Sequence, residues 1–182
     1  MRHMKQLLLI LTVMGQSVLA ADKKPLTKEE SAKVIEAAIR KAAKKPTGEL
    51  TKADLEKVTR LSLGGNQLTE VPKGLEKLTQ LTTLHLGSNQ LTSVKGLEKL
   101  TQLKHLELDG NQLTEVPEGL EKLTQLTYLN LIINRLTSVK GLEKLTQLKT
   151  LALSGNKLTD VPKELEKLTQ LKRLYLSGNQ LT

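Results

Sequence analysis

The chain of 182 residues has the length of one domain, but its composition is not that of an ordinary compact globule. Aromatic residues make up 1 %, with two Tyr and no Phe or Trp, whereas 33 of the 125 residues from 58 to 182 are Leu. The absence of Cys excludes disulfides, thiolate catalysis and Cys-bound zinc, and the net charge of +9 is only a weak indication of anionic partners.

The first twenty residues have the pattern of a secretory signal peptide. Arg2 and Lys5 precede an apolar run, Leu7–Met14, that is too short to span a bilayer. We expect cleavage near Ala20–Ala21, which places the protein outside the cytoplasm: secreted, periplasmic or at the cell surface. Cleavage removes two of the 28 basic groups and none of the 19 acidic ones, so the charge falls to +7. An uncleaved anchor or a buried N-terminal helix is the alternative.

Residues 21–57 are predicted to form a helical N-terminal cap. Thr27 and Glu30 have the spacing of a capping box. Apolar residues then recur at helical intervals (Ile35, Ala38, Ile39, Ala42). A second capping pattern, Thr51 with Asp54, predicts a short helix that leads to the first strand. An independent basic helix is the alternative, but the segment has ten basic and seven acidic groups and no large apolar wedge.

Residues 58–182 form an internal repeat, with five complete units of 22–23 residues and a partial sixth. Six asparagines mark the period at intervals of 23, 22, 23, 22 and 23 residues (Asn66, Asn89, Asn111, Asn134, Asn156, Asn179). Each unit reads L-x-x-L-x-L-x-x-N-x-L-T. Leucines at alternate positions lie on one face of a short strand, and stacked units bury these faces against one another.

This pattern resembles the leucine-rich repeat family, and the helical segment resembles the N-terminal cap of secreted bacterial internalins. The resemblance implies an α/β fold: a curved solenoid with a parallel sheet on its concave face and a helical cap at its N-terminal end. The chain turns sharply where each strand ends, and a buried Asn at that corner can satisfy the backbone groups there. We therefore interpret the six asparagines as structural.

Function is sought where the repeats differ, which is at the solvent-facing strand positions. The first column contains Arg60, Thr83, His105, Tyr128, Thr150 and Arg173; the second Ser62, His85, Glu107, Asn130, Ala152 and Tyr175; the third Gly64, Gly87, Asp109, Ile132, Ser154 and Ser177. We call the surface formed by these three columns the concave face. Rigid aromatics and an exposed Ile beside charges are typical of protein-binding surfaces. Variation without function is the alternative, because solvent-facing positions have no packing constraint.

We predict a non-enzymatic module that binds a protein partner of unknown identity through nine residues of the concave face. These are His85, His105, Glu107, Asp109, Tyr128, Asn130, Ile132, Arg173 and Tyr175. One alternative is a weak metal site, because His85 and Glu107 occupy adjacent strands in one column and His105 lies two residues before Glu107. A hydrolase is disfavoured, since no serine on a strained turn adjoins either histidine. No cofactor is expected.

Other partner classes follow from charge and from the C-terminal end. The repeats contain 16 basic and 12 acidic groups and no aromatic platform for bases, so we expect no nucleic acid. Glu-Lys pairs, as at Glu76-Lys77, predict a soluble convex side. Association with the cell envelope, a glycan or an anionic polymer is the runner-up function. The chain stops at Thr182 within a repeat, so exposed leucines there predict possible self-association.

Overall fold

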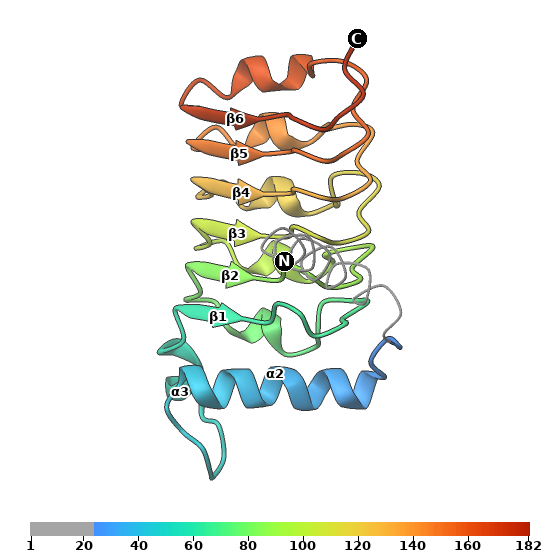
Figure 1. The fold of residues 1–182 in the computed structure, drawn as a ribbon. Helices are drawn as coiled ribbons and strands as arrows, with labels where there is room; N and C mark the ends of the chain where they lie inside the picture. The colour runs from blue at the N-terminus through green and yellow to red at the C-terminus, as the bar shows by residue number, and fades with distance from the viewer. Residues whose placement is uncertain (1–23) are drawn as a thin grey trace, which may run out of the picture.

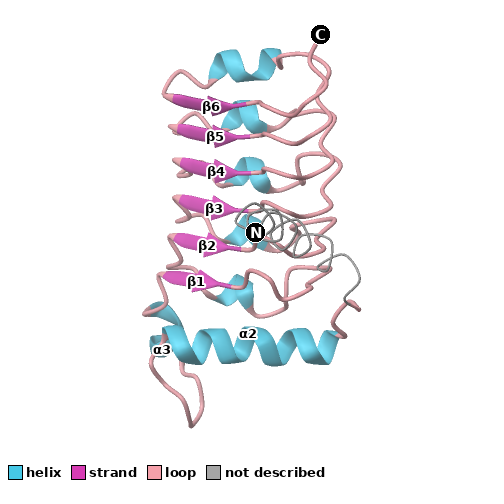
Figure 2. Cartoon of the chain, in the orientation of Figure 1, coloured by secondary structure: helices cyan, strands magenta, loops and turns pink. Residues whose placement is uncertain are grey.

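The computed structural model describes residues 24–182, so the predicted signal peptide lies outside the described residues. Two helices, α2 (Lys28–Ala42) and α3 (Lys52–Glu56), precede a parallel sheet in which the strands follow in chain order (Figures 1 and 2). The strands are β1 (Arg60–Ser62), β2 (Thr83–His85), β3 (His105–Glu107), β4 (Tyr128–Asn130), β5 (Thr150–Ala152) and β6 (Arg173–Tyr175). The predicted leucine-rich repeat solenoid with an N-terminal helix is thus confirmed.

Strand pairing aligns the repeats at equivalent positions. Leu61 pairs with Leu84 and Leu84 with Leu106, and this register continues to β6. Backbone bonds extend the ladder past the strand ends, as where the Gly110 N–H donates to the Ile132 carbonyl at 2.8 Å. The three variable columns of the sequence are therefore physical columns, one residue per strand.

Leucine fills the interior layer by layer. Every leucine from Leu61 to Leu158 is at most 3 % exposed. Each layer presents nearly the same cavity to the next, so one residue type at fixed positions fills all of them, and large aromatic fillers are not needed. No repeat can bury its leucines alone, which makes stacking the source of stability.

Buried asparagines join neighbouring repeats through their side-chain amides. In Asn134, Oδ1 accepts from the Leu113 N–H at 3.1 Å, and Nδ2 donates to the Leu108 and Leu131 carbonyls at 3.0 and 3.1 Å. Equivalent bonds are made by Asn89, Asn111 and Asn156. Together with Asn134, these residues are only 5–7 % exposed. The structural role predicted for them is consistent with this ladder.

Five short 3-10 helices lie behind the strands and stack in a row (Figure 2). They span Leu75–Lys77, Leu97–Lys99, Leu120–Lys122, Leu142–Lys144 and Lys163–Lys167. The first four follow a glycine at φ of +90° to +105°, whose N–H donates to the Glu two residues later, as from Gly96 to Glu98 at 2.6 Å. The backbone N–H of Glu98 itself and that of Gly96 lower the pKa of Glu98.

Helix α2 crosses the β1 end of the sheet (Figure 1). Both bonds of the predicted Thr27–Glu30 capping box are present. Ile35 and Ile39 are buried and Ala38 is half-buried, but Ala42 is exposed, so the predicted stripe ends one turn earlier. The helix closes the apolar end of the first repeat.

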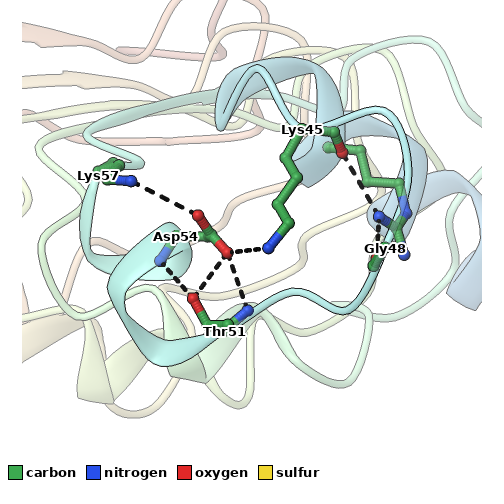
Figure 3. Close-up of polar contacts among 6 residues, drawn as sticks. Lys45, Gly48, Thr51, Asp54 and Lys57 are labelled. Carbon is green, nitrogen blue, oxygen red and sulfur yellow. Dashed lines mark hydrogen bonds and ion pairs between the residues drawn. The ribbon is translucent and has the colours of Figure 1, made fainter.

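The second predicted capping box is also present, at the start of α3 (Figure 3). Asp54 accepts from the Thr51 backbone and hydroxyl at 3.0 and 2.7 Å and from Lys45 Nζ at 2.7 Å, and Lys57 Nζ lies 3.5 Å from it. The Lys45 and Thr51 hydrogen bonds hold the pKa of Asp54 far below its usual range. This cluster fixes the loop between the two helices.

The far end of the sheet is more open. Strand β6 pairs with β5 only, and Leu174 and Leu181 are exposed. Self-association through this end stays a prediction. Within residues 24–182, no helix has both the length and the apolar character needed to cross a membrane.

Candidate functional site

The nine predicted binding residues all lie on the concave face. Strand register places His85 beside Glu107 and Glu107 beside Asn130, while His105 lies beside Tyr128. Leucines between these positions point inward and are fully buried. The alternation arises because successive side chains of a strand point to opposite faces of the sheet.

Three of the nine residues form a hydrogen-bonded cluster. Glu107 Oε2 lies 2.7 Å from His85 Nδ1, and Glu107 Oε1 lies 2.8 Å from His105 Nε2. Burial disfavours the charged carboxylate, but the hydrogen bonds from His105 and His85 outweigh it and lower the pKa of Glu107 overall. We call this group the His-Glu-His cluster.

The cluster continues into β4 through an aromatic stack. The rings of His105 and Tyr128 are nearly parallel, at 3°, with centroids 4.0 Å apart. Burial, together with the negative charges of Glu107 and Asp109, raises the pKa of Tyr128. The tyrosine is therefore a neutral hydroxyl that can donate or accept a hydrogen bond.

Asp109 lies deeper, at the carboxyl end of β3. Its Oδ1 accepts from Asn130 Nδ2 at 3.2 Å, and Asn130 Oδ1 accepts from the Ile132 N–H at 3.1 Å. A Cβ at Gly87 would lie 2.6 Å from the Asp109 carboxylate, so the glycine in this column makes room for the acid. Burial, with the Glu107 charge adding to it, raises the pKa of Asp109.

A shallow groove of about 410 Å³ lies on the other side of Tyr128. It is lined by Tyr128, Ile132, Thr150, Ala152, Arg173 and Tyr175. Ala152 is buried, and small side chains on β5 thus separate the two tyrosines. Tyr175 is 49 % exposed, which leaves its ring available for contact.

The structure corrects one detail and adds one residue that the sequence interpretation missed. Ile132, expected to be exposed, is half-buried, whereas the next residue, Ile133, is 64 % exposed at φ +54°. Equivalent positions in the other repeats also have positive φ and are Gly or Ser (Gly65, Ser88, Gly110, Gly155, Gly178). A β-branched residue in this conformation is an outlier. The signal was visible in the sequence as an Ile in a column of small residues.

Chemically, the arrangement offers a contact surface and a set of metal-ligating atoms. Tyr128, Tyr175 and Ile133 supply apolar area, and Glu107, Asp109 and Arg173 supply charges of both signs. Within residues 24–182 both histidines contact Glu107, and neither is hydrogen-bonded to a hydroxyl that could act as a nucleophile.

Comparisons with known families identify the repeats. A leucine rich repeat model matches residues 56–113 and 124–181, and a model of two leucine rich repeats matches residues 101–144. The matches cover the sheet and the 3-10 helices. A search of curated proteins found no match.

Two bacterial proteins of known structure have similar folds. An internalin of Listeria monocytogenes is 29 % identical with a TM-score of 0.58, and the alignment covers 71 % of this chain and 44 % of that one. A leucine-rich repeat protein of Leptospira interrogans is 31 % identical with a TM-score of 0.56, over 73 % of this chain and 41 % of that one. This chain thus corresponds to less than half the length of either protein.

Proposed function

We propose that this chain, which belongs to the leucine-rich repeat family, is a non-enzymatic module that binds another protein through its concave face. The groove between Tyr128 and Tyr175 is the observation that carries this proposal. Tyrosine combines a large contact area with a polar end and loses little conformational entropy on binding, which makes it a frequent hot-spot residue.

The charges around the groove favour a protein over a charged polymer. Arg173 lines the groove, whereas Glu107 lies on β3, the strand before that of Tyr128, and Asp109 follows this strand. A polyanion would be repelled by the two carboxylates, which occupy the centre of the face. A partner with complementary charges of both signs, and an apolar side chain for the groove, fits this surface.

Ile133 extends the apolar surface beyond the groove. A non-glycine residue in the left-handed region costs on the order of 1–3 kcal/mol, and such strain is concentrated at functional sites. Its side chain passes close to Gly155, where a Cβ would lie 3.3 Å from Ile133 Cγ1. We include Ile133 in the binding surface for this reason.

Export is part of the proposal, and its support is the charge and apolar order of residues 1–20. Mass spectrometry of the exported protein tests it. The expected N-terminus is Ala21. An intact Met1 in that fraction would contradict cleavage and the mature charge of +7, and absence of the protein from that fraction would contradict export.

A crosslinking and affinity experiment tests the binding surface. The chain itself is the bait, and the Tyr128→Ala, Ile132→Ser double variant is used as a second bait for comparison. Loss of the two groove side chains should weaken the partner's affinity about tenfold or more, whereas Lys122→Ala on the convex side should leave it unchanged. Equal losses from both faces would refute the assignment to the concave face.

Salt dependence separates a protein partner from the envelope polymer considered above. Binding through the tyrosine groove should change little between about 50 and 200 mM salt, whereas polyanion binding should weaken steeply, because exposed charges are screened. A steep loss would favour the polymer.

A further inference from the structure

We infer that the His-Glu-His cluster is a binding site for a divalent cation of the zinc class. The inference is independent of the proposed protein binding, because it rests on the ligand atoms of His85, His105 and Glu107 and not on the groove. It concerns a bound ion at the concave face and no enzymatic step.

Convergence of the ligand atoms is the first argument. The two imidazoles and the carboxylate each offer one ligand atom, and these atoms all lie within 4.8 Å of one another. Ligands around a tetrahedral zinc ion, with bonds of about 2.0–2.2 Å, lie about 3.3 Å apart. The pair of atoms farthest apart would close by about 1.5 Å at most, and the two histidine–glutamate pairs, now at 2.7 and 2.8 Å, would open by about 0.5 Å as the ion replaces their hydrogen bonds. Side-chain rotation can supply both movements.

The types of ligand select the class of metal. Two imidazole nitrogens with one carboxylate suit Zn²⁺ and its neighbours in the first transition row, whereas Mg²⁺ and Ca²⁺ prefer shells of oxygen atoms. An ionised carboxylate is a negatively charged oxygen ligand, so Glu107 attracts an incoming cation and offsets part of its charge.

The backbone already holds the three ligands at the correct places. His85 and Glu107 are paired residues of adjacent parallel strands, and His105 lies on the same face two residues before Glu107. Stacking against Tyr128 orients the His105 ring. Short strands anchored by fully buried leucines give this part of the chain little freedom, so binding an ion orders mainly side chains.

The cluster is open on one side. The three side chains are 28–38 % exposed, so an ion can enter from solvent. With three protein ligands, the fourth position of a tetrahedral ion is left for water or for a ligand from another molecule. Neither imidazole has a protein partner on its second nitrogen within residues 24–182, and the absence of such support usually weakens a site 10- to 100-fold. We therefore expect weaker binding than at a zinc site whose histidines are held by such partners.

Calorimetric titration of the untagged full-length chain with ZnCl₂ tests the site. The expected result is one ion per chain, with affinity weakened at least tenfold in each of His85→Asn, His105→Asn and Glu107→Gln. Two matched variants, His3→Asn near the N-terminus and Glu118→Gln on the convex side, should bind like the original chain. Circular dichroism verifies that each variant is folded.

A second measurement keeps the test valid if a variant does not fold. In NMR spectra of the original chain, Zn²⁺ should shift the imidazole signals of His85 and His105 together and saturate at one equivalent. Absence of saturable binding up to about 1 mM Zn²⁺, or binding that the three cluster variants leave unchanged, would overturn the inference.

Discussion

Replacing Asn134 by Ala tests the energetic role of the buried asparagine ladder. Asn134 is one of four ladder residues that are 5–7 % exposed, and water cannot readily replace the bonds it makes. Its Oδ1 is the acceptor for the Leu113 N–H. The carbonyls of Leu108 and Leu131 each receive a second donor, from Asn111 and Asn156 respectively, so they keep one partner in the variant.

The expected loss follows from these partners. One buried N–H left without an acceptor costs about 1–3 kcal/mol. Of the three carbonyl bonds lost, the two shorter ones, to Leu108 and Leu131, contribute about 0.5–1.5 kcal/mol each, and the one to Ile132 is long, at 3.4 Å, and adds little. Asn134→Ala should therefore lower the free energy of unfolding by about 2–6 kcal/mol. Urea denaturation followed by circular dichroism measures the loss, and an unchanged slope is needed for a direct comparison of the two free energies.

Asn66 provides the matched control, because it stands at the same repeat position but is half-buried. Its side chain donates one bond, to the Gly64 carbonyl at 3.0 Å, and among residues 24–182 no backbone N–H donates to its Oδ1. Asn66→Ala should lower the free energy of unfolding by about 1 kcal/mol. Losses for the two variants that agree within about 0.5 kcal/mol would refute the argument that bridging between repeats provides the difference.

Three further predictions concern strained backbone and acid stability. Ile133→Gly removes about 1–2 kcal/mol of strain from the left-handed conformation, but the glycine gives the unfolded chain more freedom, which costs about 0.5–1 kcal/mol. Urea titration should therefore show equal or slightly higher stability. A loss above about 1 kcal/mol would contradict this strain argument. Gly141 has a φ of +103°, and a Cβ there would lie 3.7 Å from Val116, which is ordinary contact. Gly141→Ala should therefore lower the free energy of unfolding by about 1–3 kcal/mol through backbone strain and not through a clash, and urea titration measures this loss. Because the pKa of Glu107 is lowered in the folded state, its stabilisation is present above the ordinary value of about 4.5 and is lost as pH falls through the folded pKa. In Glu107→Gln, the melting temperature should therefore fall less steeply with pH than in the original chain. Identical pH profiles of the melting temperature for the variant and the original chain would contradict this role of Glu107.

The repeat fold and its helical caps are predictable from the sequence. A period of 22–23 residues, with leucines at fixed offsets, is enough to predict the stacked strands and their register, since any slip would move the buried leucines toward solvent. The two capping boxes were equally predictable, because Thr27 with Glu30 and Thr51 with Asp54 satisfy backbone donors only three residues away. Such features depend on neighbours in sequence or on exact repetition.

Only the tertiary structure shows the contacts and the burial of the variable side chains on the concave face. The sequence placed His105 beside Tyr128, but only the folded sheet shows parallel rings 4.0 Å apart, one carboxylate shared by two imidazoles, and a groove above Ala152. Ile132, which we expected to be exposed, is half-buried, and Ile133 is exposed instead, because the backbone takes a left-handed conformation at Ile133. Side-chain rotation and burial depend on neighbours one repeat away on both sides, and a periodic pattern does not specify them.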